Sequence, residues 1–174
     1  GCEGFPEISV VTYQGAAQWA EFVQAEVENA IGCDPSLFTI EQQEFSVLLQ
    51  TTQATTPTEE RPNMWTLGWG PDYPDANNFV KEVFASGGAY SDVVDWAEGE
   101  AFEQFEALVN EAVAEADPEK RMELYAQAEQ ILVAEEAVIA PLYWYSDLEL
   151  RRPEFKGDVS LTGYERYEKW EVAE

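Results

Sequence analysis

The chain has 174 residues, 45% of them hydrophobic, and its 35 acidic and nine basic residues give a net charge of −26 with no histidine. This length and composition suit one well-packed domain, and the strong negative charge repels phosphate backbones and argues against a nucleic-acid partner. Because histidine is the commonest general base and zinc ligand, its absence excludes most enzyme classes, and we expect no metal site and no cofactor.

The first part of the chain predicts strands and helices in alternation. We expect a strand over 8–13, a helix that ends at Gly32 and a second strand over 37–43. Strand, helix and strand within about 35 residues are typical of a right-handed crossover between parallel strands. A second helix should run to about Gln53, before a third strand over 64–68. The apolar residues expected to face the core from the two helices are Trp19, Phe22, Val23, Val27, Ala30, Ile31, Phe45, Leu48 and Leu49.

Two cysteines flank this first strand–helix unit. Cys2 precedes the strand and Cys33 follows the helix, and their spacing matches no zinc or redox motif. A disulfide between them would close a loop of about 30 residues, stabilise the fold by roughly 3 to 4 kcal/mol and indicate an oxidising compartment. Two buried free thiols remain the alternative, because a sequence does not give the distance between two Cα atoms.

Helices dominate the next part of the chain. A short helix is predicted over 77–85, a flexible break over 86–91, and then two longer helices, the second with Asp117 as N-cap and Pro118 at its first position. Apolar residues at helical spacing are expected to form the core of these two helices. They are Phe102, Phe105, Leu108, Val109, Ala112, Met122, Tyr125, Ala128 and Leu132.

The apolar segment Ala137–Tyr145 contains Pro141, which a central strand would not tolerate, so we expect an edge or bulged strand. The chain then continues to three large rings, Tyr164, Tyr167 and Trp170. Those rings need a packing partner. They indicate either a last strand on the sheet or part of an interface with another domain.

The most informative segment is Met64–Phe79, in which a short strand breaks at two glycines and two prolines. It carries the aromatic residues Trp65, Trp69 and Tyr73 and the carboxylate of Asp72 across that break. Aromatic walls beside one acid suit a cationic ligand, so we expect a small-molecule site with Asp72 as the charge partner. The alternative is a tryptophan-rich core strand followed by an ordinary turn.

Two functions of other classes remain open on residue type alone. A hydrolase could use Asp72 and Asp75 as paired carboxylates, although residues three apart on a proline-containing turn have no assured geometry. An acidic protein-interaction domain would account for the net charge and for the aromatic residues near the end of the chain.

Three blocks of the sequence resemble one family, in that family's order. They are GWGPDYPDANNF over Gly68–Phe79, DPEKRMELYAQAEQIL over Asp117–Leu132 and APLYWY over Ala140–Tyr145, and RPEFKG follows at 152–157. The chain resembles the C-terminal lobe of the family 5 extracytoplasmic solute-binding proteins of ABC importers, which include the oligopeptide- and dipeptide-binding proteins. The resemblance covers nearly the whole chain.

The resemblance implies an α/β fold, a periplasmic-binding-protein-like lobe of the type II class, with a mixed, mostly parallel sheet flanked by helices. Residues 1–150 would form the C-terminal ligand-binding lobe, and residues 151–174 a tail that returns toward a missing first lobe. Because family members close two lobes on their ligand, the chain would be an excised part of a longer protein that binds ligand weakly by itself.

The resemblance also implies a function in transport and not in catalysis. Asp72 would hold the α-ammonium group of a peptide with Trp69 beside it, and Tyr143 and Tyr145 would lie near the cleft. The partners would be a peptide or similar solute, the N-terminal lobe of the same parent chain and the ABC permease subunits, outside the cytoplasm in the periplasm or as a membrane-anchored lipoprotein. Other members carry other solutes, so an oligosaccharide receptor with Trp65, Trp69 and Trp144 stacked on sugar rings remains an alternative.

Overall fold

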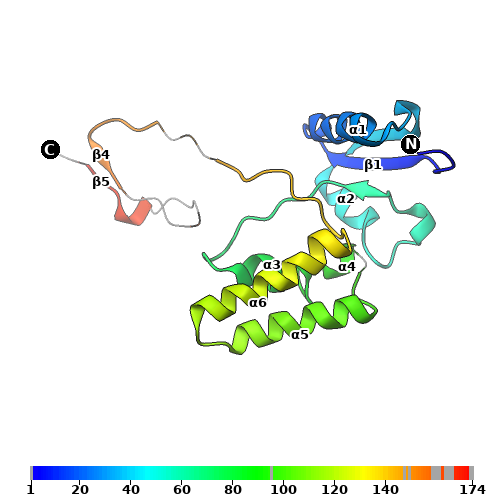
Figure 1. Ribbon diagram of the computed structural model, residues 1–174. Coiled ribbons are helices and arrows are strands. Elements are labelled where there is room, and N and C mark those ends of the chain that lie inside the picture. Colours follow the sequence, from blue (N-terminus) through cyan, green and yellow to red (C-terminus); the bar gives the residue numbers. More distant parts are fainter. Residues whose placement is uncertain are drawn as a thin grey trace. The chain divides into compact units, whose positions relative to one another are not determined.

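The computed structural model describes residues 2–94, 96–146, 148, 150–157, 162 and 167–172 (Figure 1). The chain forms two compact units, Gly1–Gly68 with Asp92–Asp95, and Trp69–Ser91 with Trp96–Glu174. The division of the chain at residue 150 stays a prediction.

The first unit begins with the predicted crossover. Strand β1 (Ile8–Tyr13) is followed by helix α1 (Ala17–Ile31), the 3₁₀ turn η1 (Pro35–Leu37) and strand β2 (Phe38–Gln43), and the two strands pair in parallel along their whole length. Gly32 ends α1 in the left-handed conformation, with φ of 71°, and its N–H donates to the carbonyl of Glu28 at 2.8 Å. Glycine adopts this conformation at little cost, which explains the helix end.

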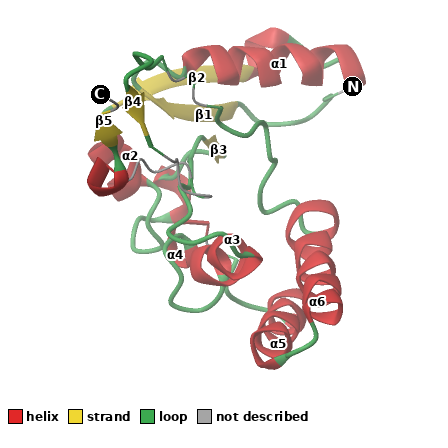
Figure 2. Ribbon diagram, turned by 90° about the vertical axis from the view of Figure 1, so that its left-hand side faces the viewer, coloured by secondary structure: helices red, strands yellow, loops and turns green. Residues whose placement is uncertain are grey.

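Helix α2 (Phe45–Thr51), the 3₁₀ turn η2 (Thr58–Glu60) and strand β3 (Met64–Trp65) complete this unit. The parallel sheet has the order β2-β1-β3, so β1 is central. Its consecutive residues Val10, Val11 and Thr12 are all buried, because α1 and α2 cover opposite faces of the sheet (Figure 2). The predicted third strand is shorter than expected: only Met64 and Trp65 pair with β1, before the chain reaches its glycines and prolines.

A disulfide joins Cys2 to Cys33, and both residues are buried. The Cα atoms lie 5.0 Å apart, within the usual range for a disulfide. The bond links the segment before β1 to the segment after α1. It therefore closes the strand–helix half of the crossover with a covalent bond.

The second unit consists mainly of helices. It contains α3 (Ala76–Phe84), α5 (Glu100–Ala114), α6 (Pro118–Gln130) and the π-helical turn η3 (Ile131–Glu135), while the short helix α4 (Ser91–Val94) lies where the two units meet in sequence. Helices α5 and α6 pack side by side (Figure 1), and the Asp117 side chain accepts hydrogen bonds from two backbone N–H groups of the first turn of α6, as predicted. The buried core consists of Val80, Ala85, Phe102, Phe105, Val109, Ala112, Tyr125, Ala128, Ile131 and Leu132.

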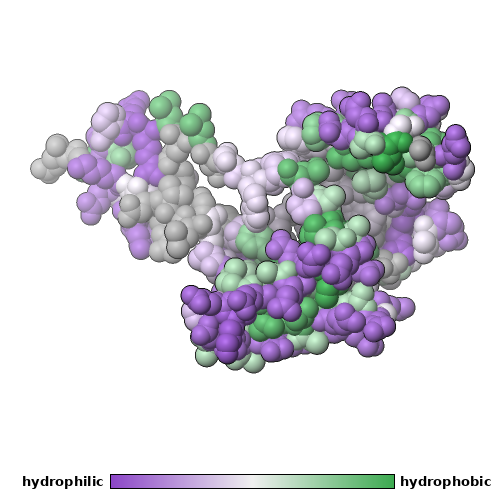
Figure 3. Space-filling view, viewed as in Figure 1, coloured by the Kyte–Doolittle hydropathy of each residue, from purple (hydrophilic) through white to green (hydrophobic). Residues whose placement is uncertain are grey.

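Several residues predicted for the core are exposed instead. Met122 is 55% exposed, because the buried side of α6 runs through Tyr125 and Ala128, is continued by Leu132 of η3 and includes the half-buried Arg121. In the first unit, Phe22, Ile31 and Phe45 are also exposed, since the small residues Ala16 and Ala20 and the side chain of Leu48 take the buried places. Figure 3 shows hydrophilic residues over most of the outward faces of α5 and α6, with an apolar strip between the two helices.

The strand predicted over Ala137–Tyr145 is wrong: none of these residues belongs to a strand. Pro141 has no N–H to donate, and the segment has no strand partner among the described residues, so it has no ladder to join.

The end of the chain forms a separate small ladder. Strand β4 (Phe155–Lys156) pairs antiparallel with β5 (Glu171–Val172), after the 3₁₀ turn η4 (Tyr167–Lys169). The guanidinium of Arg151 lies 4.3 Å from the centre of the Trp170 ring. The described strand of the tail therefore pairs within the tail and not with the three-stranded sheet, whereas Tyr164 lies outside the described residues.

Candidate functional site

Three of the six residues of the predicted ligand site, Trp69, Asp72 and Tyr73, lie in the second unit, in the turn that leads into α3. Asp72 is exposed, and Trp69 and Tyr73 are half-buried. Asp75 accepts a hydrogen bond from the Asn77 N–H at 2.8 Å and thereby caps α3, so the turn ends where the helix begins. Trp65 belongs to β3 of the first unit, where it is half-buried.

A buried amide on α3 organises this turn. Asn78 is 0% exposed, and its Oδ1 accepts a hydrogen bond from the Trp69 indole at 2.9 Å and from the Asp72 backbone N–H at 3.1 Å. Its Nδ2 donates to Glu82 Oε2 at 2.7 Å and to Asp72 Oδ2 at 3.4 Å. All four hydrogen-bonding positions of the carboxamide are therefore used inside the protein.

The neighbouring amide joins Tyr73 to the same helix. Asn77 Nδ2 donates to the Tyr73 hydroxyl at 2.6 Å and to Glu82 Oε1 at 3.1 Å, and the Tyr73 hydroxyl in turn donates to Glu82 Oε1. Burial and the hydrogen bond to this carboxylate raise the pKa of Tyr73. Tyr73 is consequently held as a neutral donor by side chains of α3, and its hydroxyl is already hydrogen-bonded within the protein.

An ion pair fixes the cap of α3 to α6. Arg121 donates through both terminal nitrogens to Asp75, with distances of 2.6 and 2.9 Å, and its Nε donates to the Ala112 carbonyl at 3.1 Å. The hydrogen bonds from this guanidinium lower the pKa of Asp75, and the same contact raises the pKa of Arg121. Asp75 therefore has a structural role as a cap and ion-pair partner, which leaves little basis for a hydrolase that pairs it with Asp72.

The two groups of contacts form one continuous chain of hydrogen bonds. Arg121 donates to the Tyr125 hydroxyl at 3.3 Å, and this hydroxyl donates to Asn77 Oδ1 at 3.0 Å. Burial raises the pKa of Tyr125, which keeps it a neutral donor. Every donor in the series points the same way, from the guanidinium through Tyr125, Asn77 and Tyr73 to the Glu82 carboxylate. This order fixes the orientation of the Asn77 amide, because the reversed amide would turn its oxygen toward the Glu82 carboxylate, which is also an acceptor.

Five of these residues were not among those predicted from the sequence: Asn77, Asn78, Glu82, Arg121 and Tyr125. All five lie in the turn block, the adjoining turn of α3 or the second sequence block. The available signal was helical spacing, since Asn78 and Glu82, like Arg121 and Tyr125, are four residues apart and share a helix face. The hydrogen bond from Tyr125 to Asn77 connects α6 to α3, two helices that lie far apart in sequence.

Aromatic contacts complete the surroundings of the turn. The Trp69 ring meets the Tyr90 ring edge to face, with centres 5.7 Å apart, and burial raises the pKa of Tyr90. With its N–H on Asn78 and its ring against Tyr90, the Trp69 side chain has a fixed orientation. Fixed aromatic surfaces of this kind suit ligand recognition because little side-chain entropy is lost on binding.

The two other predicted tyrosines lie in the irregular segment after η3. Tyr143 and Tyr145 are exposed, and their rings meet edge to face at 5.0 Å. Trp144 between them is 79% exposed and contacts the Phe79 ring of α3 at 5.3 Å. The segment thus touches the helix that carries Asn78 through Trp144, and not through the alternate residues of a strand.

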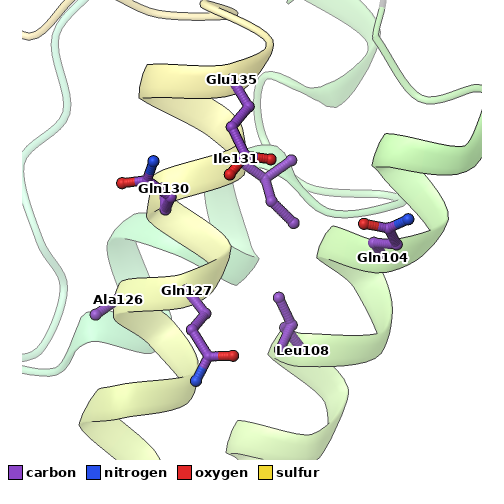
Figure 4. A pocket seen from close by; sticks show the side chains of 7 residues that line it. All are labelled: Gln104, Leu108, Ala126, Gln127, Gln130, Ile131 and Glu135. Carbon is purple, nitrogen blue, oxygen red and sulfur yellow. The ribbon is translucent and has the colours of Figure 1, made fainter.

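A shallow groove of about 510 Å³ lies between α5 and the α6–η3 helix (Figure 4). Leu108 and Ile131 point into the space between the helices. Its other lining residues are Gln104, Ala126, Gln127, Gln130 and Glu135. None of the residues predicted to contact ligand lines it, so this groove and the turn are different surfaces.

Metal binding and membrane crossing find no support in the part of the chain that the structure describes. No three Cys, Asp or Glu side chains there converge as a metal site requires. None of the described helices combines the length and the apolar character needed to cross a membrane.

No family model matches the chain. The dipeptide-binding protein DppE of Bacillus subtilis is 30% identical over 140 residues, which are 80% of this chain and 23% of that protein. The oligopeptide-binding protein OppA of the same organism is 27% identical over 153 residues, or 88% of this chain and 26% of that protein. The chain therefore spans about a quarter of the length of these relatives.

A solved periplasmic oligopeptide-binding protein from Borrelia burgdorferi has a similar fold, with a TM-score of 0.61 at 20% identity. The match covers 78% of this chain and 25% of the solved one. At this identity the likeness concerns the fold, and it agrees with the predicted α/β class.

Proposed function

This chain belongs to the family of the oligopeptide- and dipeptide-binding proteins of ABC transporters, of which it spans about a quarter of the length, and we propose that it is the C-terminal ligand-binding lobe of a receptor for peptide uptake. In this proposal Asp72 binds the peptide α-ammonium group. Trp69 and Tyr73 line the same pocket, and Trp65, Tyr143 and Tyr145 contribute further contacts in the closed parent protein. The function is binding for transport and not catalysis.

The observation that carries this proposal is the state of Asp72. Its carboxylate is exposed, and the only hydrogen bond recorded for it among the described residues comes from a neutral amide, Asn78. Asp75, three residues later, is by contrast paired with Arg121. A carboxylate on a turn that is held by hydrogen bonds to Asn78, without a cationic partner among the described residues, is suited to a cationic ligand group, and such a charged hydrogen bond is worth about 1.5 to 3 kcal/mol.

The proposed partners follow from the family. They are a peptide, the N-terminal lobe of the same parent chain and the membrane-embedded permease subunits. We place the protein outside the cytoplasm, in the periplasm or anchored to the outer side of the membrane, in keeping with the Cys2–Cys33 disulfide, because such bonds persist in oxidising compartments.

The test uses the intact parent protein and three probes: trialanine, N-acetyl-trialanine and maltotriose. We expect trialanine to bind best, and Asp72→Asn to weaken it by about 10-fold to 150-fold while N-acetyl-trialanine changes little. Glu129→Gln, which removes an exposed carboxylate from α6, is the matched control and should leave the affinity unchanged. Full trialanine affinity in Asp72→Asn would refute the ammonium contact, and preferential binding of maltotriose would assign the receptor to oligosaccharides.

A further inference from the structure

We propose that Asn78 is the positioning residue that sets the preference of this site for a free α-amine. The inference rests on the proposed function, since it assumes that Asp72 meets the ligand ammonium group. It concerns how the carboxylate of Asp72 is held, and it assigns that role to a side chain that is itself buried and does not contact the ligand.

Asn78 is completely buried. A carboxamide with no exposed surface is costly unless its polar atoms are hydrogen-bonded. Asn78 meets this condition fully, with two N–H donors on Oδ1 and two carboxylates facing Nδ2. No other side chain of this size offers two acceptor positions and two donors, so the site requires asparagine.

Asn78 holds both Asp72 and Trp69. It contacts Asp72 twice, at the backbone N–H and at Oδ2, and so restrains both the position of the residue and the rotation of its carboxylate. The same oxygen that accepts the Asp72 N–H also accepts the Trp69 indole N–H. One amide therefore fixes the charge partner and the aromatic wall relative to each other.

Asn78 is itself held in place by Glu82. Its strongest donor contact is to Glu82, at 2.7 Å, and this carboxylate also accepts hydrogen bonds from Tyr73 and Asn77. With these donors around it, Glu82 acts as a fixed acceptor one turn along α3. It keeps the Nδ2 side of the Asn78 amide turned toward the carboxylates and the Oδ1 side turned toward the N–H groups.

The experiment measures the ratio of trialanine to N-acetyl-trialanine affinity in the intact parent protein. We expect Asn78→Ala to reduce this ratio by about three-fold to ten-fold, because Asp72 then loses both contacts that orient it. In the double variant Asp72→Asn with Asn78→Ala, the ratio should fall no further than in Asp72→Asn alone. A merely structural role of Asn78 would lower the affinity for both peptides equally and leave the ratio unchanged.

Two further variants separate positioning from loss of stability. Val83→Ala shortens a buried side chain of the same helix that makes none of the hydrogen bonds of the turn, and it should lower thermal stability while the ratio stays at the wild-type value. If Asn78→Ala does not fold, Asn78→Ser replaces it, because its hydroxyl still partners one of the four groups, and the ratio should again fall.

The outcomes are distinguishable from a failure of the proposed function. If the wild-type protein does not prefer the free amine, the proposed function is wrong. If the wild type prefers it and Asp72→Asn abolishes the preference, while Asn78→Ala or Asn78→Ser keeps the full ratio, the function stands and the positioning role of Asn78 is overturned.

Discussion

The two units of the chain are held together by different means. In the first, a three-stranded parallel sheet with α1 and α2 on its faces is closed by the disulfide between Cys2 and Cys33. In the second, helices pack around an aromatic core, and the cap of α3 is tied to α6 by the ion pair between Asp75 and Arg121. A reductant breaks a disulfide, whereas acid weakens an ion pair by protonating its carboxylate. The comparison therefore predicts that the two units can be destabilised separately.

Removal of the disulfide should have the largest effect. With a sequence separation of 31 between the cysteines, the double variant Cys2→Ser and Cys33→Ser is expected to lose about 3 kcal/mol of unfolding free energy through the freer unfolded chain. Hydrogen exchange should accelerate in β1 and α1 and stay unchanged in α5 and α6. Equal acceleration in both units would show that they unfold together and would remove the distinction.

Replacement of the α3 cap should have the next largest effect, this time in the second unit. Asp75→Ala removes both the cap and the partner of Arg121, and we expect a loss of about 2 kcal/mol, because the ion pair is only partly buried. Asp75→Asn keeps a capping side chain and should therefore lose about 1 kcal/mol less than Asp75→Ala. Urea unfolding of the two variants gives the difference. Equal losses would mean that the cap contributes nothing beyond the ion pair.

Lowering the pH should weaken the same ion pair between Asp75 and Arg121 without any substitution. The pKa of Asp75 is lowered in the folded protein by the hydrogen bonds from Arg121, so its contribution to stability is present above the unfolded carboxyl pKa of about 4 and is lost as the pH falls below it. The wild type should therefore lose more stability than Asp75→Asn between about pH 5 and pH 2. Parallel pH profiles for the two proteins would contradict this assignment.

Substitutions in the irregular segment after η3 should have the smallest effect on stability, because neither the disulfide nor the ion pair involves this segment. Tyr145 is 65% exposed, and Tyr145→Ala is expected to change the unfolding free energy by no more than about 0.5 kcal/mol. Trp144→Ala, which loses the contact with Phe79, should cost about 1 kcal/mol. A larger loss for Tyr145 than for Trp144 would show that the segment packs through its tyrosines.

The sequence by itself determined the features that depend on neighbouring residues. The parallel crossover, the end of α1 at Gly32 and the start of α6 at Asp117 follow from local periodicity and capping, and all three are confirmed. The three sequence blocks also predicted the family, which the similarity to the dipeptide- and oligopeptide-binding proteins confirms.

Tertiary structure decided the features that depend on distant residues. Asp75 and Arg121 are 46 residues apart, and no pattern along the chain pairs them. The strand predicted over Ala137–Tyr145 does not form, since a strand requires a partner as well as apolar residues. The burial of Asn78 is of the same kind: its residue type could be read from the chain, but only the folded turn brings two N–H donors and two carboxylates to one amide.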